Sequence, residues 1–307
     1  MAITTGHGGD LEYIAVDTSS PYGLPSSGTL QIPSDSIISV ELTGSNGGEI
    51  LFSTNDYDGI DTVTGLEEYT LTFEYVLQRH EDTGSGHTLA NSIEYNAVNR
   101  SNGQPAKLCF VYETNGDAFE IRGAVCNSFS ISGRAGEKII CRAEYYATDV
   151  VPADSTSGLT NYDSLTASDT IGNTYEKFTG VAVSRSGSWA AGVNNFSFEI
   201  VNNAERVYTV GSATASDIVC GKQEIRGSVD ILLNDGGMDD WNEMADATEQ
   251  NIVFASGNST ASGDVSMKWT FTNALYTNFP LAYKADDAYI VSGVDWIAET
   301  VSLAAYS

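Results

Sequence analysis

Alternation of apolar and polar residues is the clearest pattern in this chain, and it is strongest in residues 195–201 and 222–233. A period of two is typical of a strand that has one packed face and one wet face. The pattern therefore predicts two such strands, with a polar connection between them. The polar positions of the pair are Ser197, Glu199, Glu224, Arg226, Ser228 and Asp230.

The first half of the chain has a similar strand pattern over residues 69–77, where Thr70, Thr72 and Glu74 occupy the polar face. Shorter runs rich in β-branched and aromatic residues predict further strands on both sides of it. These runs are residues 11–17, 37–42, 49–53, 108–112, 119–127, 138–146, 176–184, 205–210, 252–255, 265–274 and 288–298.

Helical periodicity is limited to two places. A weak period predicts one helix within residues 87–97. A stronger one predicts a helix within residues 236–251, because Trp241, Met244 and Thr248 recur at helical spacing. Since the rest of the pattern predicts strands, the expected fold class is all-β with minor α.

The predicted elements repeat along the chain. Residues 125–150 resemble residues 275–301, and each of the two predicted helices follows a strong strand, at an offset of about 150 residues. Several matches in the same order indicate a tandem duplication. The predicted organisation is a first β domain with an N-terminal arm over residues 1–151, a polar linker over 152–174, and a second β domain over 175–307.

The composition is strongly acidic, with 41 acidic and 14 basic residues and a formal net charge of −27. Such a charge repels nucleic-acid phosphates and argues against tight DNA or RNA binding, although it leaves open a role in which DNA passes without sticking. Acidity also serves solubility, or suits a high-salt cytoplasm in which charges are screened. A halophilic, haloarchaeal origin is therefore a hypothesis.

The four cysteines have no metal-binding spacing, and three of them fall in apolar alternating runs, which predicts buried thiols in a reducing compartment. The N-terminus MAITTGHGGD lacks the basic and apolar regions of a secretory signal. No apolar run approaches the roughly 18 residues of a membrane span. These features predict a protein that has no membrane partner.

Catalytic and cofactor motifs are not evident. The three histidines are isolated, and no zinc, nucleophile-elbow or phosphate-loop motif occurs. Residues 55–61 resemble the start of a calcium loop, but Gly65 stands where the bidentate glutamate belongs, which favours an acidic turn. The sequence therefore predicts neither an enzyme nor a cofactor.

A family resemblance arises from residues 195–233. A strand ends in Asn202-Asn203, a Val-Tyr-x-Val-Gly-Ser segment and a polar link follow, and Gly-Lys-Gln-Glu-Ile-Arg-Gly-Ser-Val begins a second strand that leads into a charged helix. This order resembles the tail tube proteins of tailed viruses. The resemblance extends over about residues 178–301 and reaches the first half through the internal repeat. It implies two tandem tail-tube-like β-sandwich or barrel domains, each with one flanking helix.

The resemblance implies a function as well: a major tail tube subunit, in stacked rings that form the DNA-conducting channel of a virion tail. A trimer of duplicated chains would give a pseudo-hexameric ring, assembled in the host cytoplasm. The implied partners are other copies of the chain, the tape measure, tail terminator and baseplate or tip proteins, and DNA passing without specific binding. The predicted lumen-lining residues are Thr70, Thr72, Glu74, Ser197, Glu199, Glu224, Arg226, Ser228, Asp230, Lys268 and Thr270.

Other interpretations remain open at this point. The polar faces can be the solvent faces of a monomeric β-sandwich, and the first half can be a diverged decoration domain, which would give six chains per ring. A carbohydrate-binding or host-adhesion β-sandwich would need an exposed aromatic platform, whereas the aromatic residues here mostly lie within alternating strands. A tail-associated glycosidase would need a pair of carboxylates in a cleft.

Overall fold

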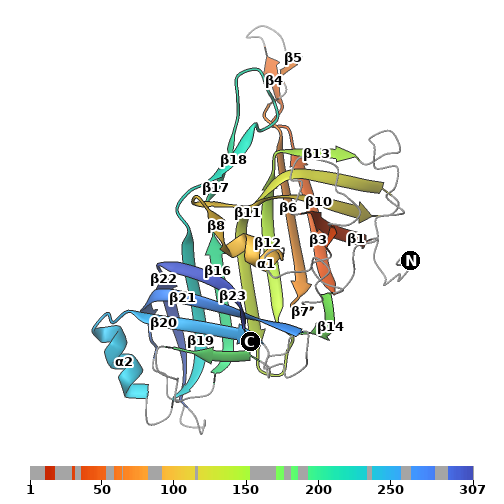
Figure 1. Ribbon diagram of the computed structural model, residues 1–307. Helices are drawn as coiled ribbons and strands as arrows, with labels where there is room; N and C mark the ends of the chain where they lie inside the picture. The colour runs from red at the N-terminus through yellow and green to blue at the C-terminus, as the bar shows by residue number, and fades with distance from the viewer. Residues whose placement is uncertain are drawn as a thin grey trace.

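Strands make up most of the chain that the computed structural model describes, so the fold is all-β with minor α, as the sequence predicts (Figure 1). The structure describes residues 11–17, 30–31, 36–52, 59–63, 65–81, 92–114, 117–152, 171–175, 181–185, 193–233, 237–256, 264–280 and 290–306.

The first half contains the helix α1 and the strands before the predicted linker. In chain order these elements are β1 (Leu11–Asp17), β2 (Leu30–Gln31), β3 (Ile37–Ser45), β4 (Glu49–Phe52), β5 (Gly59–Val63), β6 (Glu68–Val76), β7 (Gln78–Glu81), α1 (Ile93–Val98), β8 (Arg100–Ser101), β9 (Gln104–Pro105), β10 (Lys107–Thr114), β11 (Asp117–Arg134), β12 (Ile140–Ala147) and β13 (Asp149–Pro152).

The second half contains the helix α2 and the remaining strands. They are β14 (Ile171–Tyr175), β15 (Val181–Ser184), β16 (Val193–Val201), β17 (Ala204–Val207), β18 (Asp217–Cys220), β19 (Glu224–Leu233), α2 (Gly237–Ala245), β20 (Gln250–Ser256), β21 (Asp264–Asn278), β22 (Ile290–Ala298) and β23 (Thr300–Tyr306).

One antiparallel sheet crosses both halves of the molecule. Its strands pair in the order β3, β6, β12, β11, β16, β19 and β22, and the last residues of β21 pair with β22. The predicted strand pair of the second half is confirmed, because β16 and β19 form a hairpin in which Ser197 lies opposite Ser228. The two halves meet where Ser128–Arg134 of β11 pair with Asn195–Val201 of β16, and we call this pairing the internal joint.

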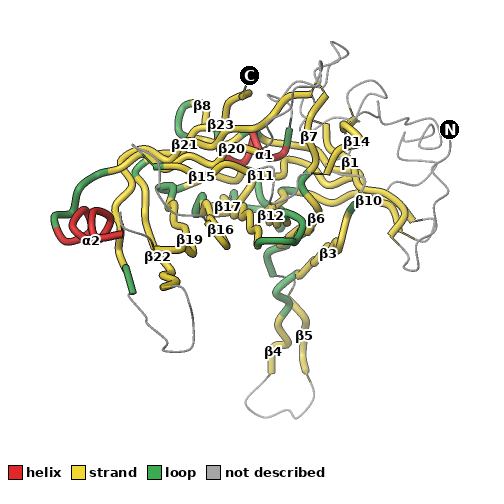
Figure 2. Tube along the Cα trace, turned by 90° about the horizontal axis from the view of Figure 1, so that it is seen from below, coloured by secondary structure: helices red, strands yellow, loops and turns green. Residues whose placement is uncertain are grey.

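A second layer covers one face of this sheet (Figure 2). In the second half it consists of β15, β20, the first part of β21, and β23. Aromatic rings fill the space between the layers: Phe198 of β16 lies 4.9 Å from Phe271 of β21, between ring centroids. Phe110 and Tyr145 make the same kind of contact in the first half, at 4.8 Å. Burial of each such ring contributes about 2 kcal/mol, so these contacts hold the layers together.

The strand pairings of the first half recur in the second half in the same order. The hairpin β3–β6 corresponds to β16–β19, the pairings of β12 with β6 and β11 correspond to those of β22 with β19 and β21, and β11–β13 corresponds to β21–β23. Even the irregular positions match. Gly123 in β11 and Asn273 in β21 both have positive φ, at 57° and 52°, where each strand bends from one layer to the other.

Each of the two hairpins carries a ribbon at its end. The first arm consists of β4 and β5 and lies between β3 and β6, and the second arm consists of β17 and β18 and lies between β16 and β19. The first arm projects away from the sheet (Figure 1). The second arm lies along the first half of the chain, where its Arg206 guanidinium is 4.1 Å from the ring centroid of Tyr146.

The other sequence predictions have mixed outcomes. Both ends of the predicted linker lie in strands, since Pro152 ends β13 and residues 171–174 belong to β14, while residues 153–170 lie outside the described chain. This part of the prediction was wrong at its edges because β14 pairs with β7, a strand far away in the sequence. Cys109, Cys126 and Cys141 are buried thiols that form no disulfide, as predicted.

Helix α2 confirms the stronger of the two predicted helices, and α1 confirms the later part of the weaker one. Neither helix of the described chain is long and apolar enough to cross a membrane. The acidic run at residues 55–61 lies partly outside the described residues.

Candidate functional site

The polar face of the continuous sheet is the candidate functional site. It is the face opposite the second layer, and polar side chains of neighbouring strands form rows across it. One row crosses the internal joint as Ser132, Ser197, Ser228 and Asp295. The central row contains Ser39, Glu74, Arg142, Ser130, Glu199, Arg226 and Ile297, one residue from each strand.

Opposite charges lie side by side in the central row. Glu199 and Arg226 form an ion pair, in which Nε of Arg226 donates to Oε2 of Glu199 at 2.7 Å. Glu74 lies opposite Arg142 on the neighbouring strand. Because these groups are at least partly exposed, each pair contributes little to stability, on the order of 1 kcal/mol or less. Their effect is on the surface itself, where the arginine charges are balanced by adjacent carboxylates.

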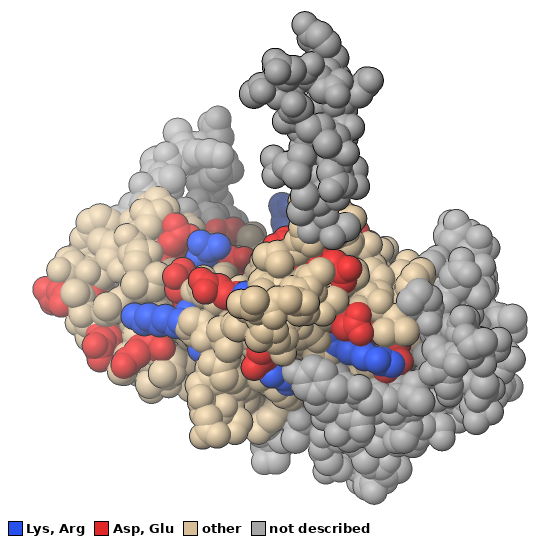
Figure 3. All heavy atoms as spheres, turned by 90° about the horizontal axis from the view of Figure 1, so that it is seen from above, with Lys and Arg blue, Asp and Glu red and all other residues tan. Residues whose placement is uncertain are grey.

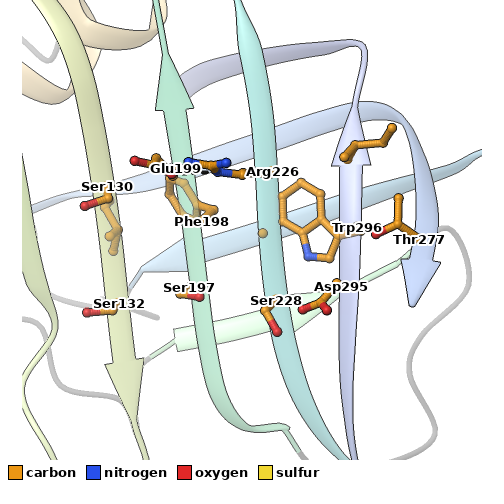
Figure 4. A pocket seen from close by; sticks show the side chains of 13 residues that line it. Ser130, Ser132, Ser197, Phe198, Glu199, Arg226, Ser228, Thr277, Asp295 and Trp296 are labelled. Atoms are coloured by element: carbon orange, nitrogen blue, oxygen red, sulfur yellow. Dashed lines mark hydrogen bonds and ion pairs between the residues drawn. The ribbon is translucent and has the colours of Figure 1, made fainter. Parts of the chain in front are cut away.

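The face is hollowed between β11, β16, β19 and β22 (Figure 4). The hollow has a volume of about 530 Å³, and four of the predicted residues line it: Ser197, Glu199, Arg226 and Ser228. Its wall also includes Ser130, Ser132 and Asp295. The hollow thus spans the internal joint, with residues of both halves in its wall, and hydroxyl and charged groups surround its opening.

Gly227 allows the sheet to pack closely beneath this hollow. A Cβ atom at position 227 would lie 2.1 Å from Cζ2 of Trp296 and 2.8 Å from the backbone oxygen of Ser197. The indole of Trp296 therefore occupies the space that a side chain would take. In the first half, Leu71 and Tyr145 occupy the corresponding cross-strand positions.

Most of the predicted residues share this face. Thr70, Thr72 and Glu74 lie on β6, Ser197 and Glu199 on β16, and Glu224, Arg226, Ser228 and Asp230 on β19. Register places them on one surface, since the strands follow one another without a change of face. Thr70 is partly covered, because Nη2 of Arg206 from the second arm donates to its Oγ1 at 3.0 Å.

Lys268 and Thr270 do not lie with the others, and their assignment to this face is corrected. Both belong to the part of β21 that pairs with β20 and β23 in the second layer. Their neighbours Trp269 and Phe271 point toward Phe198 in the core, so Lys268 and Thr270 face the opposite side of the molecule. Alternation identifies the polar side of a strand but does not tell to which layer the strand belongs.

Sequence reasoning missed several residues of the same surface. They lie on β3, β11, β12 and β22, and include Ser39, Glu41, Ser128, Ser130, Ser132, Arg142, Glu144 and Asp295. A usable signal was present in β11, where Phe129 and Ile131 alternate with the serines. The run is rich in serine and glycine, so its low hydrophobicity concealed a strand that extends to Arg134.

Asn202 fixes the internal joint at one end of the polar face. Its side chain is fully buried, at 0% exposure, and its Nδ2 donates to the carbonyl oxygens of Ala97 at 3.2 Å and Cys126 at 3.0 Å. Its Oδ1 accepts from Nη2 of Arg100 at 2.7 Å and from Nε2 of Gln223 at 3.0 Å. The amide thereby connects α1, β11 and the base of the second arm.

Arg100 is partly buried in this connection, and desolvation lowers the pKa of its guanidinium from the ordinary value. The charge is still held by good acceptors, since Nη1 also donates to the carbonyl oxygen of Gly221 at 2.8 Å. The nearby Cys220 thiol has its pKa raised, mainly by burial. This partly buried guanidinium depends on Asn202, whose Oδ1 accepts from Nε and Nη2 and whose backbone oxygen accepts from Nη2.

The polar face presents rows of hydroxyl, carboxylate and guanidinium groups. Among the described residues, no group of three His, Cys, Asp or Glu side chains is placed to hold a metal ion. Trp269 and Trp296 are buried, so neither forms an exposed aromatic platform. Seen from the end where the arms project, acidic side chains lie beside basic ones instead of leaving a continuous basic patch (Figure 3).

Comparison with known proteins adds one finding. Residues 3–298 match the family model described as "Phage tail tube protein". The match includes both halves of the chain, the continuous sheet and both arms. A search of curated proteins returned no match.

Proposed function

Because this chain belongs to the phage tail tube protein family, we propose that it is the major subunit of a viral tail tube and that its polar face lines the DNA-conducting channel. The family supports a structural role in the virion tail. The proposal adds that the chain assembles itself into stacked rings and that the polar face is turned inward.

One observation carries the proposal: the sheet is continuous across both halves of the chain, and its uncovered face is mainly polar. Its carboxylates include Glu41, Glu74, Glu144, Glu224 and Asp230, and its hydroxyls include those of the serine row. DNA phosphates are repelled by such carboxylates, and the arginines of the central row lie opposite or beside acids. A wall of this kind keeps DNA in motion because it offers few places to bind.

The repeat of strand pairings supports a ring of duplicated subunits. If each half is one tube domain, three chains supply six domains and the ring is pseudo-hexameric. Closure into a barrel removes the free strand edges that an isolated chain leaves exposed. We propose the trimer on this basis, together with tandem duplication as the origin of the two halves.

The proposed partners follow from the position of such a tube in a tail. They are copies of the chain in neighbouring rings, the tape measure, terminator and baseplate or tip proteins, and DNA that passes without specific binding. Assembly in the host cytoplasm belongs to the same proposal. The acidic surface and a net charge of −27 also fit a high-salt host.

Electron microscopy of the purified protein tests the assembly. Negative-stain images at low and high salt are expected to show rings or tubes with a central channel, in which threefold class averages reveal two similar domains per chain. High salt is expected to favour assembly because it screens repulsion between acidic subunits. A protein that stays monomeric in all conditions, and forms no oligomer on the virus particle, contradicts the proposal.

Charge reversal on the polar face tests its orientation. The double variant Glu224→Lys and Asp230→Lys is expected to slow DNA ejection from assembled particles by about tenfold or more, because two lysines per chain attract phosphates in every ring. The rate is measured by dye uptake of the released DNA. The matched control is Asp246→Lys with Glu249→Lys, which changes the net charge equally but lies after α2, and it is expected to leave the rate unchanged. Equal rates for both variants exclude the inward orientation.

A further inference from the structure

We propose that the internal joint is repeated between neighbouring subunits, where residues 277–280 of one chain pair with residues 43–46, at the end of β3, in the next chain. This inference rests on the proposed function and specifies which edges meet and in what register. The partner is a second copy of this chain. The observation behind it is the internal joint itself, in which the edge strand β11 of the first half pairs with the edge strand β16 of the second half.

Corresponding positions follow from the strand registers. Val125 and Cys126 lie opposite Tyr146 and Tyr145 in the first half, as Leu275 and Tyr276 lie opposite Ile297 and Trp296 in the second. The residues after them correspond as well, so residues 277–280, at the end of β21 and just after it, take the place of 127–130 of β11. Both strands have a register irregularity at the same point, between 126 and 128 and between 276 and 278.

The other edge of the proposed joint, β3, corresponds in the same way to β16. Ile200 of β16 lies opposite Ile225, as Gly44 of β3 lies opposite Tyr69. Asn46-Gly47 then corresponds to Asn202-Asn203, and Gly47 and Asn203 both have φ of 50°. The two hairpins therefore leave the sheet through the same backbone bend, each with an asparagine just before it.

The internal joint supplies the expected register. In it, Ser128 lies opposite Val201 and Phe129 opposite Ile200, and the N–H of Asn202 donates to the carbonyl oxygen of Asn127 at 2.7 Å. Transferred to two chains, Asn278 lies opposite Ser45 and Phe279 opposite Gly44, while the N–H of Asn46 donates to the carbonyl oxygen of Thr277. Thr277 also has a hydroxyl that can accept from the N–H of Gly48, as Oδ1 of Asn127 accepts from Ala204.

Exposure is consistent with edges that lack a partner in the single chain. Ser45 and Asn46 are exposed at the end of β3, and Thr277 and Asn278 are exposed on the other edge. At the internal joint the corresponding residues are half-buried or buried, with Asn202 at 0%. Pro280 does not prevent pairing. Its counterpart Ser130 lies opposite Glu199 in a non-hydrogen-bonded pair, so the neighbouring β3 needs no N–H from position 280.

The arms show a second part of the same joint. The second arm lies over the first half, where Arg206 covers the ring of Tyr146 and donates from Nη2 to the carbonyl oxygen of Tyr69 at 2.6 Å. Ile297 corresponds to Tyr146 and is 48% exposed. In the repeated joint, the first arm of the neighbouring chain lies over this isoleucine. An exposed apolar side chain at this position is explained by a cover that only a second chain supplies.

Disulfide trapping tests the register. In a Cys220→Ser background, the variant Ser45→Cys with Asn278→Cys is assembled and oxidised, then separated on a non-reducing gel. Facing cysteines at a non-hydrogen-bonded pair have Cα atoms close enough for a disulfide. Most of the chain is expected to move into a covalent ladder that ends at the size of one ring. The two positions lie at opposite edges of the sheet of one chain, so a ladder reports contact between chains.

Two controls make the result decisive. Ser128→Cys with Val201→Cys places the same pair in the internal joint and is expected to form a disulfide without any ladder. Glu41→Cys with Asn278→Cys shifts one cysteine by four residues, roughly 13 Å along β3, and is expected to give no ladder. Rings or tubes that form normally, with a working internal control and no 45–278 ladder, overturn the inference and leave the proposed function standing. A chain that remains monomeric contradicts the proposed function instead.

Discussion

Replacement of Asn202 by leucine is expected to lower the free energy of unfolding by about 3–5 kcal/mol. The side chain is buried and connects the carbonyl oxygens of Ala97 and Cys126 with Arg100 and Gln223. Leucine has a similar volume, so the loss comes from groups that stay buried without a partner. The carbonyl oxygens of Ala97 and Cys126 contribute most, since both bonds are buried, whereas Arg100 is partly buried and keeps the backbone carbonyl oxygens of residue 202 and Gly221 as acceptors.

Urea unfolding, monitored by tryptophan fluorescence on the unassembled chain, measures this effect. The matched control is Asn46→Leu, because Asn46 corresponds to Asn202 but is exposed, and it is expected to change the unfolding free energy by less than about 0.5 kcal/mol. The same control is expected to raise the subunit concentration needed for assembly by about tenfold, if Asn46 is buried between chains. An Asn202→Leu variant as stable as the parent contradicts the role of this amide in joining the halves.

Replacement of Gly227 by alanine is expected to cost about 2–3 kcal/mol of stability, since the new methyl group overlaps Trp296. The added Cβ would lie 2.1 Å from Cζ2 of the indole, and the indole is itself enclosed by Phe254 and Phe271. A shift of the ring therefore disturbs the core between the layers. Thermal unfolding measures the loss, and Gly44→Ala is the control, because its Cβ would meet Tyr69 only at 3.3 Å.

The first half suggests a rescue of this variant. There Leu71 and Tyr145 occupy the cross-strand positions that Gly227 and Trp296 have in the second half. Trp296→Tyr, added to Gly227→Ala, removes the ring atoms that collide with the methyl group and is expected to recover part of the lost stability. An additive loss in the double variant contradicts the explanation by overlap, since overlapping residues are expected to show coupling.

The sequence predicted the elements of this fold better than their arrangement. The hairpin of β16 and β19 and the buried state of Cys109, Cys126 and Cys141 follow from strict local alternation. The pairing of β11 with β16 did not, because alternation reports the faces of a strand and contains no information on its partner. The internal joint depends on residues far apart along the chain, such as Arg100 and Asn202.

The candidate site shows the same limit. Glu199 and Arg226 were predicted to share a face because they lie on adjacent strands of a hairpin, and the ion pair confirms their proximity. Lys268 and Thr270 were placed on that face because they alternate in the same way, yet β21 carries them in the second layer. The positive φ of Asn273 marks where β21 leaves that layer, and a single asparagine in a strand is too weak a signal to predict such a change.

The internal joint also affects how fast and how reversibly rings would form. Within one chain the two edges are covalently tethered, so they meet at a high effective concentration. Formation of the internal joint therefore does not depend on the concentration of the protein. In a ring of such chains, joints within a chain would alternate with joints between chains, and only the joints between chains would need two molecules to meet. In the proposed ring, the joints between chains would have no counterpart of Arg100, since residues 246–249 after α2 are Asp, Ala, Thr and Glu. Dilution is thus expected to release whole chains in which the internal joint is intact. Tubes would then grow and shorten by two domains at a time.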